Sequence, residues 1–272
     1  MHNRRVIVVG DMIEDAFHEC EEAHLAQEGP VVCANVKHVH DAWGGSFLVY
    51  ANCVTLFGIE SVSHYYNREI TCEKDRYYVD GHLLFRGDSL SRSDLYHEEQ
   101  EHLEINLAAE IHTADMVLIA DYGKGTITER VLSICNGAKR VILDPHISRV
   151  PYKMFKPTTY MPNRHEWKKD RRMTPAEHVI VTSDKDGVVV HRDGDSRTYP
   201  SHNSQPNTVI GAGGAFMAAY AFASLHKPRF VEAIEIKFAL DYVAEAMTST
   251  WQCINSIYKV EEDDDGKATN LH

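Results

Sequence analysis

The sequence predicts an α/β protein in which a parallel sheet is covered by helices and carries a small lid of β-strands. Three observations predict this fold class. Short apolar runs recur along the chain and end in acidic or hydroxyl-bearing residues, helical patterns separate these runs, and two further segments alternate apolar with polar residues.

Four apolar runs have the composition of strands that are buried on both faces of a sheet. Each run leads directly into a polar residue, and the four pairs are 6–10 with Asp11, 116–120 with Asp121, 140–143 with Asp144, and 178–182 with Ser183. Helical patterns over 98–112 and 128–138 lie between them, as parallel connections require. Ligands of such sheets bind at the carboxyl ends of the strands, so the polar residues there are candidates for a site.

A different pattern predicts the lid. Residues 31–39 and 76–85 alternate apolar with polar side chains, which is typical of half-exposed strands, and we assign the lid to about 28–42 and 74–88. Two helices are predicted near the C-terminus, over 213–225 and 230–252. We expect one domain over 1–258 and a flexible acidic tail over 259–272.

Composition excludes several classes of protein. The chain has 272 residues with 43% hydrophobic composition, which is enough for a globular core. Its 28 basic and 40 acidic residues give a net charge of −12, which argues against binding nucleic acid by phosphate neutralisation. The first apolar run is too short for a signal peptide or a membrane span, so we expect a cytoplasmic protein without membrane association. Six cysteines without a C-x-x-C pair predict reduced thiols.

A glycine-rich sequence, Ile210-Gly-Ala-Gly-Gly-Ala-Phe216, stands where the first of the two C-terminal helices begins. Free backbone N–H groups and the positive end of a helix could converge there on one anion. A loop that only needs tight turns is the alternative explanation. The fragment Gly123-Lys-Gly-Thr126 is not a Walker A loop, because the earlier glycine and the following hydroxyl residue are missing.

Several carboxylate and amide side chains stand at or just after predicted strand ends: Asp11, Asp15, Asp121, Asp144, Asn163 and Glu166. Taken singly, each is more readily explained as a helix cap or a turn residue. Their shared position favours one polar rim of the sheet. Among 17 histidines, His38 and His40 form a close pair, but no partner stands at ligand spacing, so we expect no metal site there.

A series of short motifs runs in a fixed order through most of residues 5–253. The motifs are Val8-Val-Gly-Asp11 to Asp15, Glu28-Gly-Pro-Val-Val, Trp43-Gly-Gly45, Leu56-Phe-Gly58, Lys74-Asp-Arg76, Leu84-Phe-Arg86-Gly-Asp88, Ala120-Asp-Tyr-Gly-Lys-Gly125, Leu143-Asp-Pro145, Met161-Pro-Asn163 to Glu166, Val181-Thr-Ser to Gly187, and Gly211-Ala-Gly213. Each motif is weak alone, but the ordered set resembles the ribokinase-like (PfkB) carbohydrate kinases. Within that family it is most similar to the D-glycero-β-D-manno-heptose 7-phosphate kinase domain of the bifunctional heptose synthesis enzyme.

The resemblance implies a three-layer ribokinase-like fold and transfer of a phosphoryl group from ATP, with Mg²⁺, to a sugar hydroxyl. It implies a sugar or sugar phosphate and a nucleotide as partners, and a homodimer that forms through the lid. It also implies a set of site residues, which are Asp15, Gly44 and Gly45 for the sugar, Thr182 and Gly187 for the nucleotide, Asn163 and Glu166 for Mg²⁺ and phosphate, and Gly211, Ala212 and Gly213 for the anion hole.

The chain departs from the family where the resemblance places catalysis. The family motif Asp-x-Thr-Gly-Ala-Gly-Asp ends in the general base, and the residue here is Gly214. The earlier polar positions of this motif hold Thr208 and Ile210, and the asparagine expected after the Gly-Gly loop is Leu48. Loss of a general base typically slows a reaction by about 10²- to 10⁴-fold. The segment between 58 and 74 also looks too short for the usual strand and helix.

Two functions therefore stay open. One is a sugar kinase with a degraded active site that is catalytically impaired or uses another group as base, and the other is a pseudokinase that acts as a binding or structural protein. Gly214, Leu48 and Ile210 favour the pseudokinase, whereas the anion loop and the Asn163 motif favour the kinase. A nicotinamide-dependent dehydrogenase is disfavoured, because the required glycine spacing does not follow the first strand.

Overall fold

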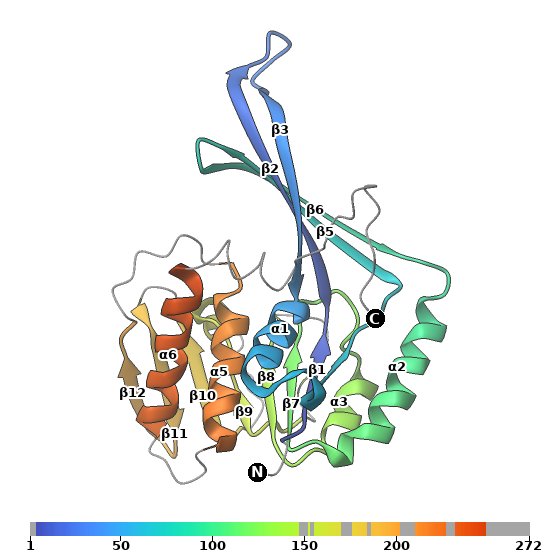
Figure 1. Cartoon of the computed structure of the whole chain (residues 1–272), viewed down its shortest axis with the longest axis vertical. Helices are drawn as coiled ribbons and strands as arrows, with labels where there is room; N and C mark the ends of the chain where they lie inside the picture. The colour runs from blue at the N-terminus through green and yellow to red at the C-terminus, as the bar shows by residue number, and fades with distance from the viewer. Residues whose placement is uncertain are drawn as a thin grey trace.

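The computed structural model describes residues 4–146, 152, 155–169, 176–183, 186–201, 210–226 and 232–248. An eight-stranded sheet forms the body in the order β12-β11-β10-β9-β8-β7-β1-β4 (Figure 1). Its strands are β1 (Val6–Gly10), β4 (Val62–Tyr65), β7 (Met116–Ala120), β8 (Val141–Asp144), β9 (Thr159–Tyr160), β10 (His178–Thr182), β11 (Val188–Arg192) and β12 (Asp195–Tyr199). Pairing is parallel from β4 to β10 and antiparallel at β11 and β12.

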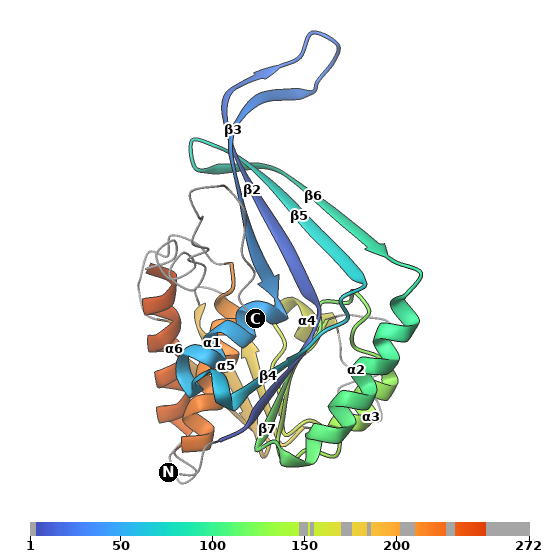
Figure 2. The ribbon, with the colours of Figure 1, turned by 45° about the vertical axis from the view of Figure 1, so that its right-hand side comes forward.

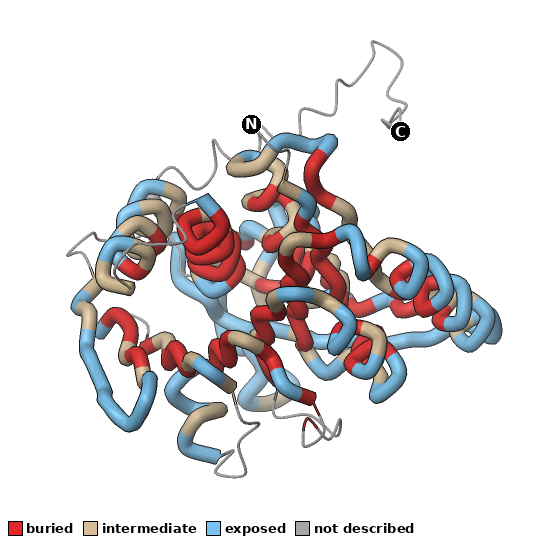
Figure 3. Tube along the Cα trace, turned by 90° about the horizontal axis from the view of Figure 1, so that it is seen from below, coloured by how far each residue is buried: buried red, intermediate tan, exposed pale blue. Residues whose placement is uncertain are grey.

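Helices cover both faces of this sheet, as the predicted three-layer α/β fold requires. Val6 and Val8 of β1 pack in one core with α1 (Ser46–Phe57), α5 (Ala212–His226) and α6 (Glu232–Thr248). Ile7 and Val9 point the other way, into a core with α2 (Tyr96–Glu110) and α3 (Glu129–Cys135). The helix α5 is buried along nearly its whole length and appears red in Figure 3. A short helix, α4 (Arg164–Lys169), follows β9.

A second sheet forms the lid, in the order β3-β2-β5-β6 (Figure 2). Its strands are β2 (Met12–Leu25), β3 (Val32–Gly45), β5 (Ile70–Val79) and β6 (His82–Arg92). The lid is therefore larger than 28–42 and 74–88, because β2 belongs to it. Strand β2 is solvent-exposed at its outer end and is rich in carboxylates and histidines. This polar composition is unusual for a strand, so the sequence pattern does not predict one there.

Two expectations for the lid region need correction. Residues 76–85 are not one strand, since the chain reverses at Asp80 and Gly81, whose φ angles of 48° and 77° are typical of an Asp-Gly hairpin turn. The segment between 58 and 74 does contain a strand, β4, which pairs in parallel with β1. It has only four residues, of which Ser63 and His64 are polar, so its apolar signal is weak.

Within the described residues, no helix is long and apolar enough to cross a membrane. The five described cysteines are free thiols; Cys33 is half-buried and the other four are buried. Burial raises the pKa of the Cys135 thiol to about 12, which makes it unreactive. The sixth, Cys253, and the predicted tail lie outside the described residues.

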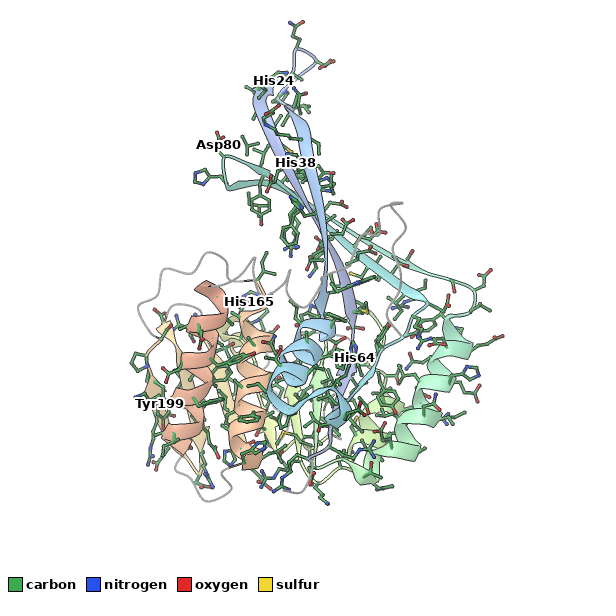
Figure 4. The ribbon with its side chains drawn as sticks, viewed as in Figure 1. His24, His38, His64, Asp80, His165 and Tyr199 are labelled. Carbon is green, nitrogen blue, oxygen red and sulfur yellow. The ribbon has the colours of Figure 1, made fainter. Side chains whose placement is uncertain are left out.

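A buried hydrogen bond joins the start of α1 to the edge strand β4. Ser46 Oγ lies 2.9 Å from His64 Nε2, and the ring of Tyr50 stacks on the imidazole with a centroid distance of 5.0 Å. Figure 4 shows His64 at the base of the lid, where α1 begins. Burial lowers the pKa of His64 to about 3, so the imidazole is neutral in the folded protein at neutral pH.

We expect His64 to make folding stability depend on pH. The unfolded chain takes up a proton near the ordinary pKa of 6.5, but the folded chain does not until about pH 3. The stabilisation is therefore complete above pH 6.5 and is lost as the pH falls towards 3. Between about pH 6 and about pH 4, His64→Gln should lose less unfolding free energy than the parent in denaturant titrations. The exposed His97→Gln should keep the parental dependence; equal slopes for all three would contradict the assignment.

Candidate functional site

The carboxyl ends of β1, β7, β8 and β10 meet below the lid, and Asp11 organises this edge. Its buried carboxylate accepts hydrogen bonds from the backbone N–H groups of Tyr122 (2.9 Å), Lys124 (3.0 Å) and Thr126 (2.9 Å). Charge-assisted bonds of this kind are short and strong. Asp11 therefore fixes the loop after β7, and all its described contacts are structural.

The same loop, residues 121–126, is held from above as well. Arg92 Nη2 donates to Lys124 O at 2.6 Å, and Tyr96 Oη donates to Gly125 O at 3.0 Å. Gly123 has a φ of 71°, and a Cβ there would lie 2.5 Å from the His146 ring. Any other residue would be strained at this φ and would have to displace the His146 ring.

The three residues expected to bind sugar do lie together. A Cβ on Gly44 would meet Asp15 Oδ2 at 2.4 Å, so glycine lets the carboxylate lie against the backbone. Gly45 has a φ of 62° and turns the chain from β3 into α1. Asp15 is not free, because it forms a buried ion pair with Arg76, whose guanidinium also lies 5.4 Å from the Phe17 ring.

Cations gather at this place although the chain is acidic overall. Lys74 is the cross-strand neighbour of Asp15, and its Nζ lies 6.0 Å from the Tyr122 ring. Burial lowers the pKa of Lys74, and the charge of Asp15 opposes this shift. Lys124 lies near the buried thiol of Cys72, and its charge opposes the rise that burial causes in the pKa of that thiol. Lys74 and Arg76 belong to one of the sequence motifs, but no role is predicted for them. Their spacing of two residues, which places both side chains on one face of a strand, is the signal that the sequence contains.

Carboxylates form a second group on the other side of Tyr122. Tyr152 Oη donates to Asp121 Oδ2, and Gly123 N donates to Asp121 Oδ1 at 2.7 Å. Burial raises the pKa of Asp144 well above its usual range, and Glu166 and Asp121 add to the shift. Burial also raises the pKa of Glu166 to about 7, against hydrogen bonds from Asn163.

Asn163 and Glu166 are held together by hydrogen bonds that each side chain accepts from the backbone N–H of the other residue. Asn163 Oδ1 accepts from the N–H groups of His165 and Glu166, both at 2.9 Å, and Glu166 Oε2 accepts from Asn163 N at 2.8 Å. This reciprocal pattern is a capping box at the start of α4. In the described part of the chain, no group of three or more His, Cys, Asp or Glu side chains is arranged to hold a metal ion.

The expected nucleotide residues follow β10. Thr182 N donates to Pro162 O at 3.0 Å, and Thr182 bridges to Asn163 in parallel, which places the two motifs side by side. Gly187 has a φ of 87°, and a Cβ there would lie 2.1 Å from Tyr199 O. Between them, the buried Ser183 Oγ has no hydrogen-bond partner among the described residues. Ser183 belongs to the motif that follows this strand, but no role is predicted for it from the sequence.

The glycine-rich loop meets the start of α1. Gly211 has a φ of 84° and Ala212 begins α5, and a Cβ on Gly213 would meet no described residue within 4 Å. A Cβ on Gly211 would lie 3.0 Å from the Leu48 side chain, and one on Gly214 would lie 3.1 Å from Val49 Cγ2. Leu48 and Gly214, which occupy two of the four positions where the resemblance implies a polar residue, are therefore neighbours, whereas Thr208 lies outside the described residues.

Curated relatives of this chain carry the description "Bifunctional protein HldE". The one from Geotalea uraniireducens is 24% identical over 323 residues, covering 98% of this chain and 66% of the relative. The one from Sulfurimonas denitrificans is 26% identical over 275 residues, covering 80% and 56%. The chain thus spans just under two thirds of the length of the first relative and less of the second. No family model matches the chain.

Solved structures of sugar kinases share the fold. Thermotoga maritima ribokinase aligns with a TM-score of 0.66 at 13% identity, covering 94% of this chain and 99% of that one. A mutant of Escherichia coli phosphofructokinase-2 gives 0.67 at 12%, covering 94% and 98%. Arabidopsis thaliana ribokinase, in complex with ribose and ATP, gives 0.63 at 15%, covering 94% and 99%. With its three layers and its β lid, the chain has the ribokinase-like fold that these solved sugar kinases share.

Proposed function

We propose that this chain is a heptose 7-phosphate kinase-like protein that binds a nucleotide and a sugar phosphate but transfers the phosphoryl group poorly. The contact between α1 and α5 carries the proposal. The position of the family's general base is Gly214, and the residues that face it are Leu48 and Val49. Gly214 has no side chain, and the side chains of Leu48 and Val49 cannot accept a proton, so any turnover must use a water or another group as base.

The sugar side of the site suits an anionic substrate. Asp15, Gly44 and Gly45 are the proposed contacts for sugar hydroxyls. Lys74 and Lys124 flank them, and Arg76 lies on Asp15. Ammonium and guanidinium groups bind phosphate well, so a sugar phosphate fits these charges better than a neutral sugar does.

The nucleotide side suits ATP. The buried hydroxyl of Ser183 lacks a described partner, and a phosphate or ribose oxygen would supply one. Thr182, Ser183 and Gly187 would hold the nucleotide, and the amides of Gly211, Ala212 and Gly213 would face the transferring phosphoryl group, which is the chemical group that ATP supplies.

The donor set also suits Mg²⁺. This ion usually takes one or two protein carboxylates and completes its shell with water and phosphate, so a cage of three side chains is not required. Glu166, with Asn163 beside it, would supply a carboxylate oxygen, and the ion's charge would offset the repulsion that Glu166, Asp144 and Asp121 exert on one another.

A pseudokinase remains the second candidate, because one observation favours it. The Leu48 side chain lies against Gly211, so an apolar group covers part of the loop whose amides would face the phosphoryl group. An oxyanion formed beside a methyl group has no stabilising partner on that side.

We expect the chain to bind ATP with Mg²⁺ at micromolar to millimolar concentration in calorimetric titrations. Ser183→Ala should weaken this binding by roughly fivefold, the value of one neutral hydrogen bond. It should leave the melting temperature without nucleotide unchanged or higher, since it removes an unpaired buried hydroxyl. The exposed Ser133→Ala on α3 should behave like the parent. Absence of binding at millimolar ATP would exclude the nucleotide site.

We expect phosphoryl transfer to be restored only by a combined change at the α1–α5 contact. Gly214→Asp alone brings its Cβ to 3.1 Å from Val49 Cγ2, so Val49→Ala should accompany it, together with Leu48→Asn. A carboxylate in the first turn of α5 is also favoured by the helix dipole. ATP consumption with heptose 7-phosphate should rise at least tenfold, towards the roughly 10²- to 10⁴-fold value of a general base.

The matched control keeps the space and removes the carboxylate: Gly214→Ala with Val49→Ala and Leu48→Asn should not raise turnover. Should the aspartate variant bind ATP and still consume none with a panel of sugar phosphates, the pseudokinase would be the correct function.

We also propose that two chains associate through their lids, because the lid exposes many large apolar side chains. Val32 of β3 is 50% exposed and Leu84 of β6 is 43% exposed. Open strand edges and such patches are usually covered by a partner. Light scattering at micromolar concentration should show a homodimer, and Val32→Asp with Leu84→Asp should give a monomer. Leu95→Asp, which alters a leucine that is 54% exposed outside the lid, should stay dimeric. A monomeric parent would contradict the proposal.

A further inference from the structure

A cavity of about 510 Å³ lies at the edge of the body sheet opposite the candidate site. Met116, Thr159 and His178, at its wall, are the first residues of β7, β9 and β10. These are the amino ends of parallel strands, at the bottom of Figure 1, whereas the site below the lid is built on their carboxyl ends. The helices α5 and α6 supply the other wall. The cavity is thus separate from the proposed kinase site.

Charges of both signs line this cavity in equal number. Lys139, Arg140 and Arg192 are the cations, and Glu177, Glu232 and Glu235 are the anions. Among the described residues, no ion pair within 4.0 Å joins any of these cations to any of these anions. Cationic and anionic side chains that line one cavity without forming ion pairs with each other can bind a molecule that has both a negative and a positive group.

The charged side chains of this cavity make some hydrogen bonds within the protein but have further donors and acceptors that a ligand could use. Arg140 donates one hydrogen bond, from Nη1 to Ser224 O at 3.0 Å, although a guanidinium has five N–H groups. Arg192 Nε lies 3.4 Å from the exposed carboxylate of Asp193. Glu232 accepts from Tyr199 Oη at 3.0 Å. Burial raises the pKa of Glu235, while the charges of Arg140 and then Arg192 oppose that shift. The carboxylate and the two guanidinium groups therefore interact electrostatically.

The uncharged lining sets the depth and size of the site. Tyr220 and Thr159 are both buried, and they lie in the cavity lining with the apolar Met116. The volume lies within the range of about 300 to 1,000 Å³ that is usual for small-molecule sites.

We propose that this cavity binds a small zwitterion of the α-amino acid class, with its carboxylate on Arg140 and Arg192 and its ammonium group on Glu232 and Glu235. A guanidinium fork matches the planar carboxylate, and a compact ammonium group matches the paired glutamates. The proposal is independent of the kinase function, since no residue is shared between the two sites.

The test is a thermal-shift screen of the full chain with each common amino acid at about 10 mM, followed by calorimetry with those that stabilise it. At least one amino acid should bind. Its analogue without the amino group and its analogue without the carboxylate should each bind at least about tenfold more weakly.

Variants locate the site. Arg192→Gln and Glu235→Gln should each weaken binding about tenfold or more, whereas Arg197→Gln on β12 and Glu245→Gln on α6, which lie outside the cavity lining, should match the parent. ATP binding should be the same in all four variants, which separates this result from the fate of the kinase proposal. Failure of every amino acid to stabilise the chain, equal binding of a singly charged analogue, or equal weakening in the controls would overturn the proposal.

Discussion

The carboxylate of Asp11 is the interaction on which the functional edge of this molecule depends. Three N–H groups from a loop more than a hundred residues away converge on it, at distances between 2.9 and 3.0 Å. Without this acceptor, the buried amide of Thr126 would lack a partner, at a cost of about 1–3 kcal/mol, and the half-buried amides of Tyr122 and Lys124 would lose theirs as well. Because Asp11 fixes the loop, Tyr122 and Lys124 hold defined positions between the lid cations and the carboxylates.

The other constraint is the meeting of α1 with α5, which joins the N-terminal part of the chain to its C-terminal third. Glycine makes this close approach possible. A Cβ on Gly211 would lie 3.0 Å from the Leu48 side chain, and a Cβ on Gly214 would lie 3.1 Å from the Val49 side chain. Apolar side chains of α1 thus pack directly against glycines at the start of α5. A change at Leu48 or at Gly214 would therefore affect the packing of both helices.

Much of the body sheet could be predicted, because buried parallel strands such as 116–120 and 178–182 are almost wholly apolar. Strands β2 and β4 could not, since their composition is polar and their pairing depends on residues far along the chain. The Asp80-Gly81 dipeptide is a turn signal in the sequence, but apolar and polar residues alternate on both sides of it, and this pattern predicted one strand in place of two. Polar residues that follow the strands, such as Asp121 and Asp144, do lie close enough to interact. The partners of other site residues, such as Arg76 for Asp15, are set by the register of the lid strands, which composition does not encode.

The buried pair of Asp15 and Arg76 has a consequence for how ligands would enter. In the free protein the carboxylate and the guanidinium satisfy each other, so a sugar hydroxyl would have to compete with an internal cation for Asp15. An anion that attracts Arg76 would release that carboxylate at the same time. In a molecule that carries both a phosphate and hydroxyls, the phosphate would bind Arg76 and a hydroxyl would bind the released Asp15. By thermodynamic linkage, each of these two interactions would strengthen the other to the same extent.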